Sequence, residues 1–360
     1  MRARELGIRI GPFPSGEHGA ITDVPGVRVG HTTLVEGDDV RTGVTVIRPH
    51  EGEALLDPVF AGHHRLNGNG EMTGIHWIEE TGLLAGTIGL TNTHSVGVVR
   101  DAIVRDAVLH APADEAVWSM PVVAETYDGG LNDINGQHVT AAHALAALAS
   151  AAPGPVAEGS VGSGTGMVCH ELKGGIGTAS RVVPADQGGY TVGVLVQANH
   201  GRRQRLRVNG VPVGERLGSI PLPEYPWERQ AGSGSIIVVV ATDAPLLPLQ
   251  CRRLAQRAAL GVGRTGGAGE DGSGDLMLCF ATGNRGLGAL IAEGGTEVAV
   301  RTVAHARIGA LFDAVIDATE EAILNAMLQS ATMRGHRGTV VYGLDGEALA
   351  QALAAGSTAR

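Results

Sequence analysis

The amino-acid sequence predicts a single α+β domain in which stacked β-sheets are covered by helices. Three observations support this. Strand-like and helix-like segments alternate along all 360 residues, several strand-like segments are placed to pair as antiparallel hairpins, and no internal repeat or low-complexity linker divides the chain. Apolar residues make up 43% of the chain, enough for a sizeable core. The 55 glycines are about twice the roughly 7% average and predict many tight turns and close backbone approaches.

The first half of the chain contains apolar patterns of both periods. A period near 3.6 predicts a helix, and short β-branched runs bounded by glycine predict strands. In chain order the predictions are strands at 21–34 and 42–49, a helix at 72–84, a strand and then a helix from about Val96 within 85–109, a strand with a polar loop at 119–139, and an alanine-rich helix at 140–152.

The second half of the chain also contains apolar patterns of both periods. It predicts neighbouring strands at 174–183 and 190–201, a strand at 235–246, a helix at 248–263, a strand at 274–284 and a long amphipathic helix at 306–328. One face of the last helix carries Leu311, Val315, Ala318, Ala322 and Ala326. Segment 209–234 is rich in proline, glycine and charge without periodicity, which is typical of a functional or flexible segment.

The charge balance and the absence of apolar runs exclude several classes of partner. The net charge is −10, from 27 basic and 37 acidic residues. The one basic stretch, 200–208, is short and has no interleaved aromatic residues, so we expect no nucleic-acid partner. No charge-free apolar run approaches the roughly 18 residues of a membrane span, and the first residues carry no apolar signal segment. We therefore expect a cytoplasmic protein without a membrane partner.

Motifs for metals and cofactors are weak. Cys169, Cys251 and Cys279 are too widely spaced for a disulfide framework or a zinc pattern. His63 and His64 are adjacent, so in a strand they point to opposite faces. The glycine-rich stretch 261–266 follows a predicted helix, which indicates a helix end and a loop rather than a nucleotide site. The sequence thus predicts no metal ion and no organic cofactor.

The most informative stretch is Gly-Ser-Gly-Ser at 232–235, directly before the apolar run Ile236–Val240. Ser235 is either a structural residue at the end of a loop or a nucleophile. A serine hydroxyl needs a base, and cleavage of the Gly234–Ser235 bond would expose an α-amine with a pKa of about 7.7–8.0 on the same residue. We expect Gly234 to permit unusual backbone angles that bring its carbonyl onto the serine hydroxyl.

Longer motifs occur along nearly the whole chain in a characteristic order. They are ITDVPGVRVGHTTL, TGIHWIEETGLL, LTNTHSVGVV, AETYDGGLNDINGQHV, VGSGTGMVCHELKGGIGTASR, VLVQANHG, GSIIVVVATDAPLLP and GSGDLMLCFATGN. With these motifs the chain resembles the L-aminopeptidase/D-esterase family, the DmpA-like β-peptidyl aminopeptidases of peptidase family S58.

The resemblance implies a four-layer αββα sandwich and a serine nucleophile of the N-terminal type. It implies self-cleavage at Gly234–Ser235, because the family's serine directly precedes the apolar strand, whereas Gly232–Ser233 does not fit. The products would be a large chain, 1–234, and a small chain, 235–360, which stay associated as αβ units in a homotetramer. No metal and no cofactor are implied.

Further roles follow from the resemblance by position. Asn199 matches an oxyanion-hole asparagine, and Ser273 and Asp275 match a serine and an acidic residue that orient and polarise the nucleophile. The family more often has glutamate where this chain has Asp275. Tyr127 matches a tyrosine that lines the site, and Glu125 matches an acidic residue that pairs with the free amino group of the substrate. As residues i and i+2 of one strand, Glu125 and Tyr127 are expected on one face.

The predicted activity is that of a serine aminopeptidase or amidase that releases a small N-terminal L-, D- or β-amino acid from short peptides, amides or esters. Two alternatives stay open. One is an acyltransferase of the ornithine acetyltransferase type, which has a threonine in an Ala-Thr-Met-Leu setting where this chain has Gly-Ser-Ile-Ile. The other is an uncleaved, inactive scaffold protein.

Overall fold

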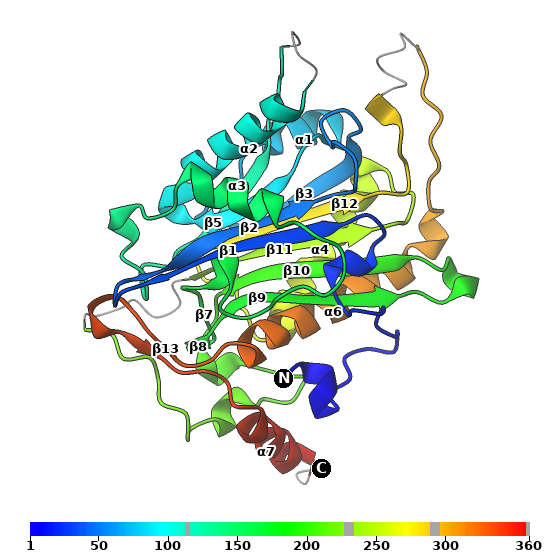
Figure 1. Cartoon of the computed structure of the whole chain (residues 1–360). Helices are drawn as coiled ribbons and strands as arrows, with labels where there is room; N and C mark the ends of the chain where they lie inside the picture. The colour runs from blue at the N-terminus through cyan, green and yellow to red at the C-terminus, as the bar shows by residue number, and fades with distance from the viewer. Residues whose placement is uncertain (112–115, 227–233, 289–295, 358–360) are drawn as a thin grey trace.

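In the computed structural model of the chain, two β-sheets lie face to face and helices cover their outer faces (Figure 1). The structure describes residues 1–111, 116–226, 234–288 and 296–357. One sheet contains, in spatial order, β1 (Arg28–Glu36), β2 (Val40–Arg48), β5 (Ile88–Asn92) and β6 (Val122–Thr126). The other contains β4 (Leu83–Leu84), β3 (Val59–Gly68), β12 (Ser273–Ala281), β11 (Gly234–Thr242), β10 (Thr191–Asn199) and β9 (Gly175–Val182).

Neighbouring strands are mostly antiparallel, but each large sheet contains one parallel pair. These pairs are β5 with β6 and β11 with β12. A parallel pair needs a crossover connection, usually a helix. Here α2 (Val96–His110) connects β5 to β6, and α4 (Pro248–Arg264) connects β11 to β12. The strand and helix predicted within 85–109, and those predicted from 235 to 284, are therefore the two crossover units of the fold.

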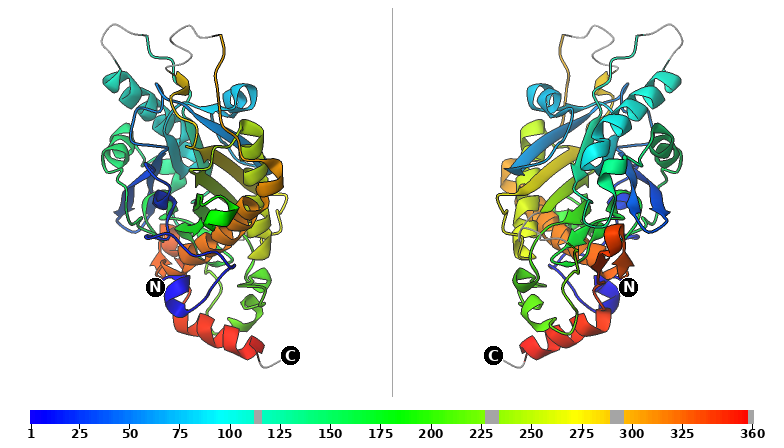
Figure 2. Two further views of the ribbon diagram at one scale, coloured as in Figure 1. Left: turned by 90° about the vertical axis from the view of Figure 1, so that its right-hand side faces the viewer. Right: turned by 90° about the vertical axis from the view of Figure 1, so that its left-hand side faces the viewer.

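The helices form the two outer layers. Helices α2 and α3 (Ala141–Ala149) pack on the four-stranded sheet, and α4 and α6 (Gly309–Leu328) pack on the six-stranded sheet (Figure 2). A separate apolar cluster fills the space between the two sheets. The predicted four-layer αββα sandwich is confirmed.

The uniformly apolar start of β11 is explained by burial on both faces. Ile236, Val238 and Val240 belong to the core shared with α4 and α6. Ile237 and Val239 alternate with them and belong to the core between the sheets. Ser235 directly precedes this run, so the next two residues of the strand, Ile236 and Ile237, are buried in the two different cores.

Several boundaries differ from the sequence prediction. Residues Ile21–Asp23 form a 3-10 turn before β1, and the helix expected at 72–84 is only α1 (Ile75–Thr81), followed by β4. Neither β3 nor α7 (Gly346–Ser357) was predicted from the sequence. The predicted face of α6 is buried as expected, but the helix is buried all round from Asp317 to Leu328.

Smaller elements complete the described part of the chain. Two short hairpins pair β7 (Val168–Cys169) with β8 (Leu172–Lys173) and β13 (Met333–Arg334) with β14 (Val340–Val341). Of segment 209–234, residues 227–233 lie outside the described residues, and so does the Gly232–Ser233 bond. Across the described ranges, every helix is too short or too polar to cross a membrane.

The contact between β9 and α6 depends on the absence of a side chain at Gly177. A Cβ atom there would lie 1.9 Å from the Ala322 carbonyl oxygen and 2.7 Å from the Ala326 nitrogen. We expect Gly177→Ala to force α6 off the sheet and lower the free energy of unfolding by about 1–3 kcal/mol. Urea denaturation measures this. Gly263→Ala, at an exposed position of α4 with open space around it, is the control and should leave stability equal or about 0.5–1 kcal/mol higher. Equal stability of Gly177→Ala and wild type would contradict the close packing.

Candidate active site

The candidate site is built at one end of the six-stranded sheet, where β10 and β3 end and β11 and β12 begin. The register pairs Ser235, at the start of β11, with Asn199 at the end of β10. On its other side Ser235 is paired with Gly274 at the start of β12. Strand β3 continues the row, with Asn67 opposite Asp275. Residues that are far apart in the sequence are therefore brought side by side by strand pairing alone.

The hydroxyl of Ser235 is held by the backbone on both sides. Its Oγ donates to the Gly234 carbonyl oxygen at 2.7 Å and accepts from the Gly274 N–H at 3.1 Å. Only 5% of the residue is exposed. The Oγ atom thus lies beside the carbonyl group of the peptide bond that precedes it, with a backbone donor directed at it.

The structure gives a steric reason for glycine at position 234. A Cβ atom at Gly234 would lie 2.5 Å from the Asn199 carbonyl oxygen. At Gly274 a Cβ would lie 2.4 Å from the Asn69 carbonyl oxygen. The glycines beside the serine are explained by crowding of neighbouring backbones.

The side-chain amide of Asn199 is fixed in one orientation. Its Oδ1 accepts from the Val168 N–H at 2.7 Å, and its Nδ2 donates to the Tyr127 carbonyl oxygen at 2.9 Å. Since an N–H only donates and a carbonyl only accepts, the oxygen and nitrogen cannot be exchanged. Asn199 is 1% exposed and its amide has a second N–H. An amide held in this way is suited to donate to a developing oxyanion.

Ser273 and Asp275 lie on one face of β12, as their spacing predicts. Ser273 Oγ donates to Asp275 Oδ1 at 2.6 Å, and Asn67 Nδ2 donates to Asp275 Oδ2 at 3.2 Å. Burial raises the pKa of Asp275, and the hydrogen bonds from Ser273, Asn67 and the Ile236 backbone partly offset that rise. The Asp275 carboxyl group therefore contacts the backbone of Ile236, the residue that follows Ser235.

Alternation along the strands separates this pair from the Ser235 hydroxyl. Asp275 shares the face of Met277, which packs toward the helices, whereas Ser235 shares the face of Ile237, which points between the sheets. The contact of β12 with Ser235 Oγ is made by the Gly274 backbone. Ser273 and Asp275 lie beside the backbone at the 234–235 bond, because Gly234 is paired with Ser273.

Glu125 approaches from the other sheet. It is 3% exposed, and its carboxylate accepts from the Glu71 N–H at 3.0 Å and from the Thr93 hydroxyl. Burial raises its pKa, and these two hydrogen bonds oppose the rise. A Cβ atom on Gly70 would lie 3.0 Å from Glu125 Oε1 and 3.3 Å from Gly274 Cα. The Glu125 carboxylate and the Gly274 backbone, which donates to Ser235, therefore both lie next to Gly70.

The side chain of Tyr127 does not share the buried face of Glu125, as had been expected from their spacing. Strand β6 ends at Thr126, so the alternation of faces stops there, and Tyr127 is 52% exposed. Its backbone carbonyl holds Asn199, as described above. The supporting residues Asn67 and Thr93 were not predicted from the sequence, because only the folded sheets bring them to the site.

The fold and the arrangement at Ser235 define a serine peptidase with an N-terminal-nucleophile type of hydrolase fold. The sequence model of peptidase family S58 matches residues 19–341, and the chain belongs to this family. The predicted resemblance is thereby confirmed.

Relatives and solved structures agree over nearly the whole chain. A β-aminopeptidase from Burkholderia sp. superimposes with a TM-score of 0.93 at 56% identity, covering 99% of both chains. The L-aminopeptidase D-Ala-esterase/amidase of Ochrobactrum anthropi, described as a variant of the Ntn hydrolase fold, superimposes with a TM-score of 0.89 at 43% identity and 98% coverage of both. The β-peptidyl aminopeptidase BapA of Sphingosinicella microcystinivorans is 49% identical over 95% of this chain and 89% of its own. The chain is thus an aminopeptidase, which favours that prediction over the acyltransferase and scaffold alternatives.

The hydrogen bond from Thr93 lowers the pKa of Glu125 against the effect of burial. Thr93→Val keeps the shape of the side chain and removes the donor, so the charged carboxylate loses stabilisation. A hydrogen bond to a charged group contributes about 1.5–3 kcal/mol, so the pKa of Glu125 should move upward in the variant. The midpoint is measured from the ¹³C shift of the labelled Glu125 carboxyl group. Thr81→Val, whose hydroxyl donates to the Trp77 carbonyl, is the control. A midpoint that stays in place or falls in Thr93→Val would refute this role.

Proposed function

We propose that the chain is a self-processing serine aminopeptidase in which Ser235 first cleaves its own chain and then attacks substrates. The observation that carries this proposal is the position of Ser235 Oγ, 2.7 Å from the Gly234 carbonyl oxygen and supported by the Gly274 N–H. Cleavage at this bond would yield a large chain, 1–234, and a small chain, 235–360.

The self-cleavage step moves the acyl group of Gly234 from the nitrogen of Ser235 to its Oγ atom. The Oγ atom attacks the Gly234 carbonyl carbon, the C–N bond breaks, and the hydroxyl proton ends on the departing nitrogen. The resulting ester links Gly234 to Ser235 Oγ. Water then hydrolyses it to give a carboxylate on Gly234 and a free α-amine on Ser235.

The free amine then acts as the base for substrate turnover. It takes the proton from Ser235 Oγ, which attacks the substrate carbonyl to form an acyl-enzyme, and the proton passes to the leaving group. Water hydrolyses the acyl-enzyme. The second N–H of Asn199 donates to the oxyanion. Ser273 and Asp275 lie beside the 234–235 bond, so they are positioned to orient the amine rather than to contact Oγ.

Glu125 is the proposed partner of the substrate's ammonium group. A buried carboxylate with lone pairs to spare favours a cation over a neutral blocked amine. We therefore propose that the substrates are short peptides, amides or esters with a free, small N-terminal L-, D- or β-amino acid. The names of the BapA and Ochrobactrum relatives, which mention β-peptides and D-Ala esters, support this range. We propose that the exposed side chain of Tyr127 lines the entrance of the site.

For assembly we propose a homotetramer of cleaved αβ units. The resemblance to the family supports this state, and light scattering of the purified protein measures it. A monomeric αβ unit in solution would contradict the proposed assembly and leave the site proposal untouched.

The first prediction of this mechanism is cleavage itself. Wild-type protein should separate on a denaturing gel into fragments of about 24 and 13 kDa, in proportion to the 36.9 kDa of the whole chain. The small fragment should begin Ser-Ile-Ile-Val by Edman sequencing. Ser235→Ala should remain one folded, uncut and inactive chain, because no hydroxyl can attack the Gly234 carbonyl. A wild-type chain that stays intact and still hydrolyses Ala-p-nitroanilide would rule out the amine as base.

The second prediction concerns the oxyanion donor. Loss of one such donor costs about 10²–10³ in kcat, so Asn199→Ala should lose activity mainly in kcat with little change in KM. Because Asn199 also bonds to Val168 and Tyr127, circular dichroism must show an intact fold in the variant. A change confined to KM would assign Asn199 to substrate binding.

The third prediction concerns the pH dependence of binding. Because the pKa of Glu125 is raised by burial, the carboxylate should become protonated at a higher pH than an exposed glutamate. KM for a free-amine substrate should therefore rise as the pH falls through this raised pKa. Glu125→Gln should raise KM for Ala-p-nitroanilide at neutral pH and leave self-cleavage intact. Equal turnover of free and N-acetylated substrates by wild type would exclude the ammonium site.

A further inference from the structure

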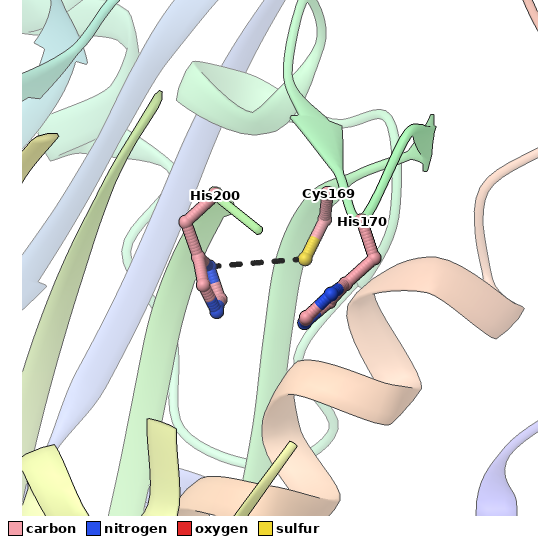
Figure 3. A group of neighbouring side chains, drawn as sticks. All are labelled: Cys169, His170 and His200. Atoms are coloured by element: carbon pink, nitrogen blue, oxygen red, sulfur yellow. Dashed lines mark hydrogen bonds between the residues drawn. The ribbon is translucent and has the colours of Figure 1, made fainter. Parts of the chain in front are cut away.

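A second cluster of reactive side chains lies directly behind the candidate active site. Cys169, at the end of β7, and His170 are neighbours in the sequence. His200, about thirty residues further along and directly after β10, lies beside them (Figure 3). One sulfur and two imidazole ligand atoms lie within 4.8 Å of one another, and all three residues are buried. Among the described residues this is the group that combines a thiol with two imidazoles.

The tautomer of His170 leaves one nitrogen without a partner. Its Nδ1 lies 3.1 Å from the Arg202 carbonyl oxygen. Because a carbonyl only accepts, Nδ1 carries the hydrogen and Nε2 has a bare lone pair. That Nε2 is buried and has no hydrogen-bond partner. Metal-ligating histidines almost always donate their other N–H to a carbonyl, a carboxylate or water in this way.

The second histidine and the cysteine complete a set of compatible donors. Cys169 Sγ lies 3.8 Å from His200 Nδ1. Zinc–sulfur and zinc–nitrogen bond lengths in tetrahedral geometry place those two ligand atoms about 3.6 Å apart. Binding of an ion therefore requires a contraction of only a few tenths of an ångström at this pair.

Of the three groups, the thiol of Cys169 must lose its proton to become a ligand. Nε2 of His170 already lacks a hydrogen, because Nδ1 carries it toward the Arg202 carbonyl oxygen. Binding of a divalent ion would release the thiol proton to solvent and leave a metal–thiolate bond.

The cluster lies next to the residues that hold the Asn199 side chain. Cys169 follows Val168, whose N–H holds Asn199 Oδ1, and His200 follows Asn199 itself. The backbone N–H of His170 also donates to the His200 carbonyl at 2.6 Å. An ion bound here would tie together the two segments that fix the Asn199 side chain.

We propose that Cys169, His170 and His200 form a structural binding site for a thiophilic transition-metal ion such as Zn²⁺. One thiolate and two imidazoles suit ions of this class, whereas Mg²⁺ and Ca²⁺ require oxygen ligands. The three ligands leave a fourth position for water. The ion braces the end of β10 and does not contact the substrate.

The test uses Co²⁺ as a spectroscopic probe of the full, reduced protein. A thiolate–cobalt bond gives a charge-transfer band in the near ultraviolet, which the wild type should show with one Co²⁺ bound per chain and lose on addition of Zn²⁺. Cys169→Ala should abolish the band. Cys279→Ala removes another buried thiol, in the core between β12 and the helices, and should keep it. A wild type without the band, or a band that survives Cys169→Ala, would overturn the proposal.

A second measurement covers the case in which Cys169→Ala does not fold. His170→Gln should lower cobalt affinity at least tenfold, and the thermal midpoint of wild type, but not of His170→Gln, should rise with added Zn²⁺. An equal rise in both proteins would show that Zn²⁺ binds elsewhere and would also overturn the proposal.

Discussion

The site depends on one constraint: the pairing register that places the start of β11 between the end of β10 and the start of β12. This register sets Asn199 on one side of Ser235 and Gly274 on the other. The Gly274 N–H then reaches Ser235 Oγ at 3.1 Å. A shift of one residue in either pairing would turn the serine to the opposite face of the sheet.

Close backbone contacts make this register possible. Gly234 and Gly274 stand where any side chain would meet the carbonyl oxygen of a neighbouring segment. Gly70 is a milder case, because a Cβ atom there would lie 3.0 Å from Glu125 Oε1 and 3.3 Å from Gly274 Cα. Glycine at positions 234 and 274 is thus explained by crowding around one serine. The high glycine content has a direct structural cause at these positions.

The sequence predicted the layers of the fold better than its connections. Strong apolar runs such as Ile236–Val240 identified the central strands, and period-3.6 patterns identified α4 and α6. Strand β3 was missed because His63, His64 and Arg65 interrupt its apolar pattern. Which strands pair with β3, and in which direction, is likewise decided by tertiary packing, which local patterns do not encode.

The site residues divide in a similar way. Ser235 stood out because of its local context, whereas the roles of Asn199, Glu125 and Asp275 came from the resemblance to a family. Asn67, Thr93 and the cluster of Cys169, His170 and His200 carried no local signal, because their partners lie far away in the sequence. The expected common face of Glu125 and Tyr127 failed because β6 ends between them, at Thr126.

The central claim is that a single oxygen atom, Ser235 Oγ, serves both self-cleavage and substrate turnover. The most direct measurement is to mix the cleaved protein with the p-nitrophenyl ester of alanine, quench it in acid within the first turnover, and weigh the separated chains by mass spectrometry. The small chain should gain one alanyl group, and fragmentation should place that group on its first residue, Ser235. An alanyl group on the large chain, or on another residue of the small chain, would contradict the claim.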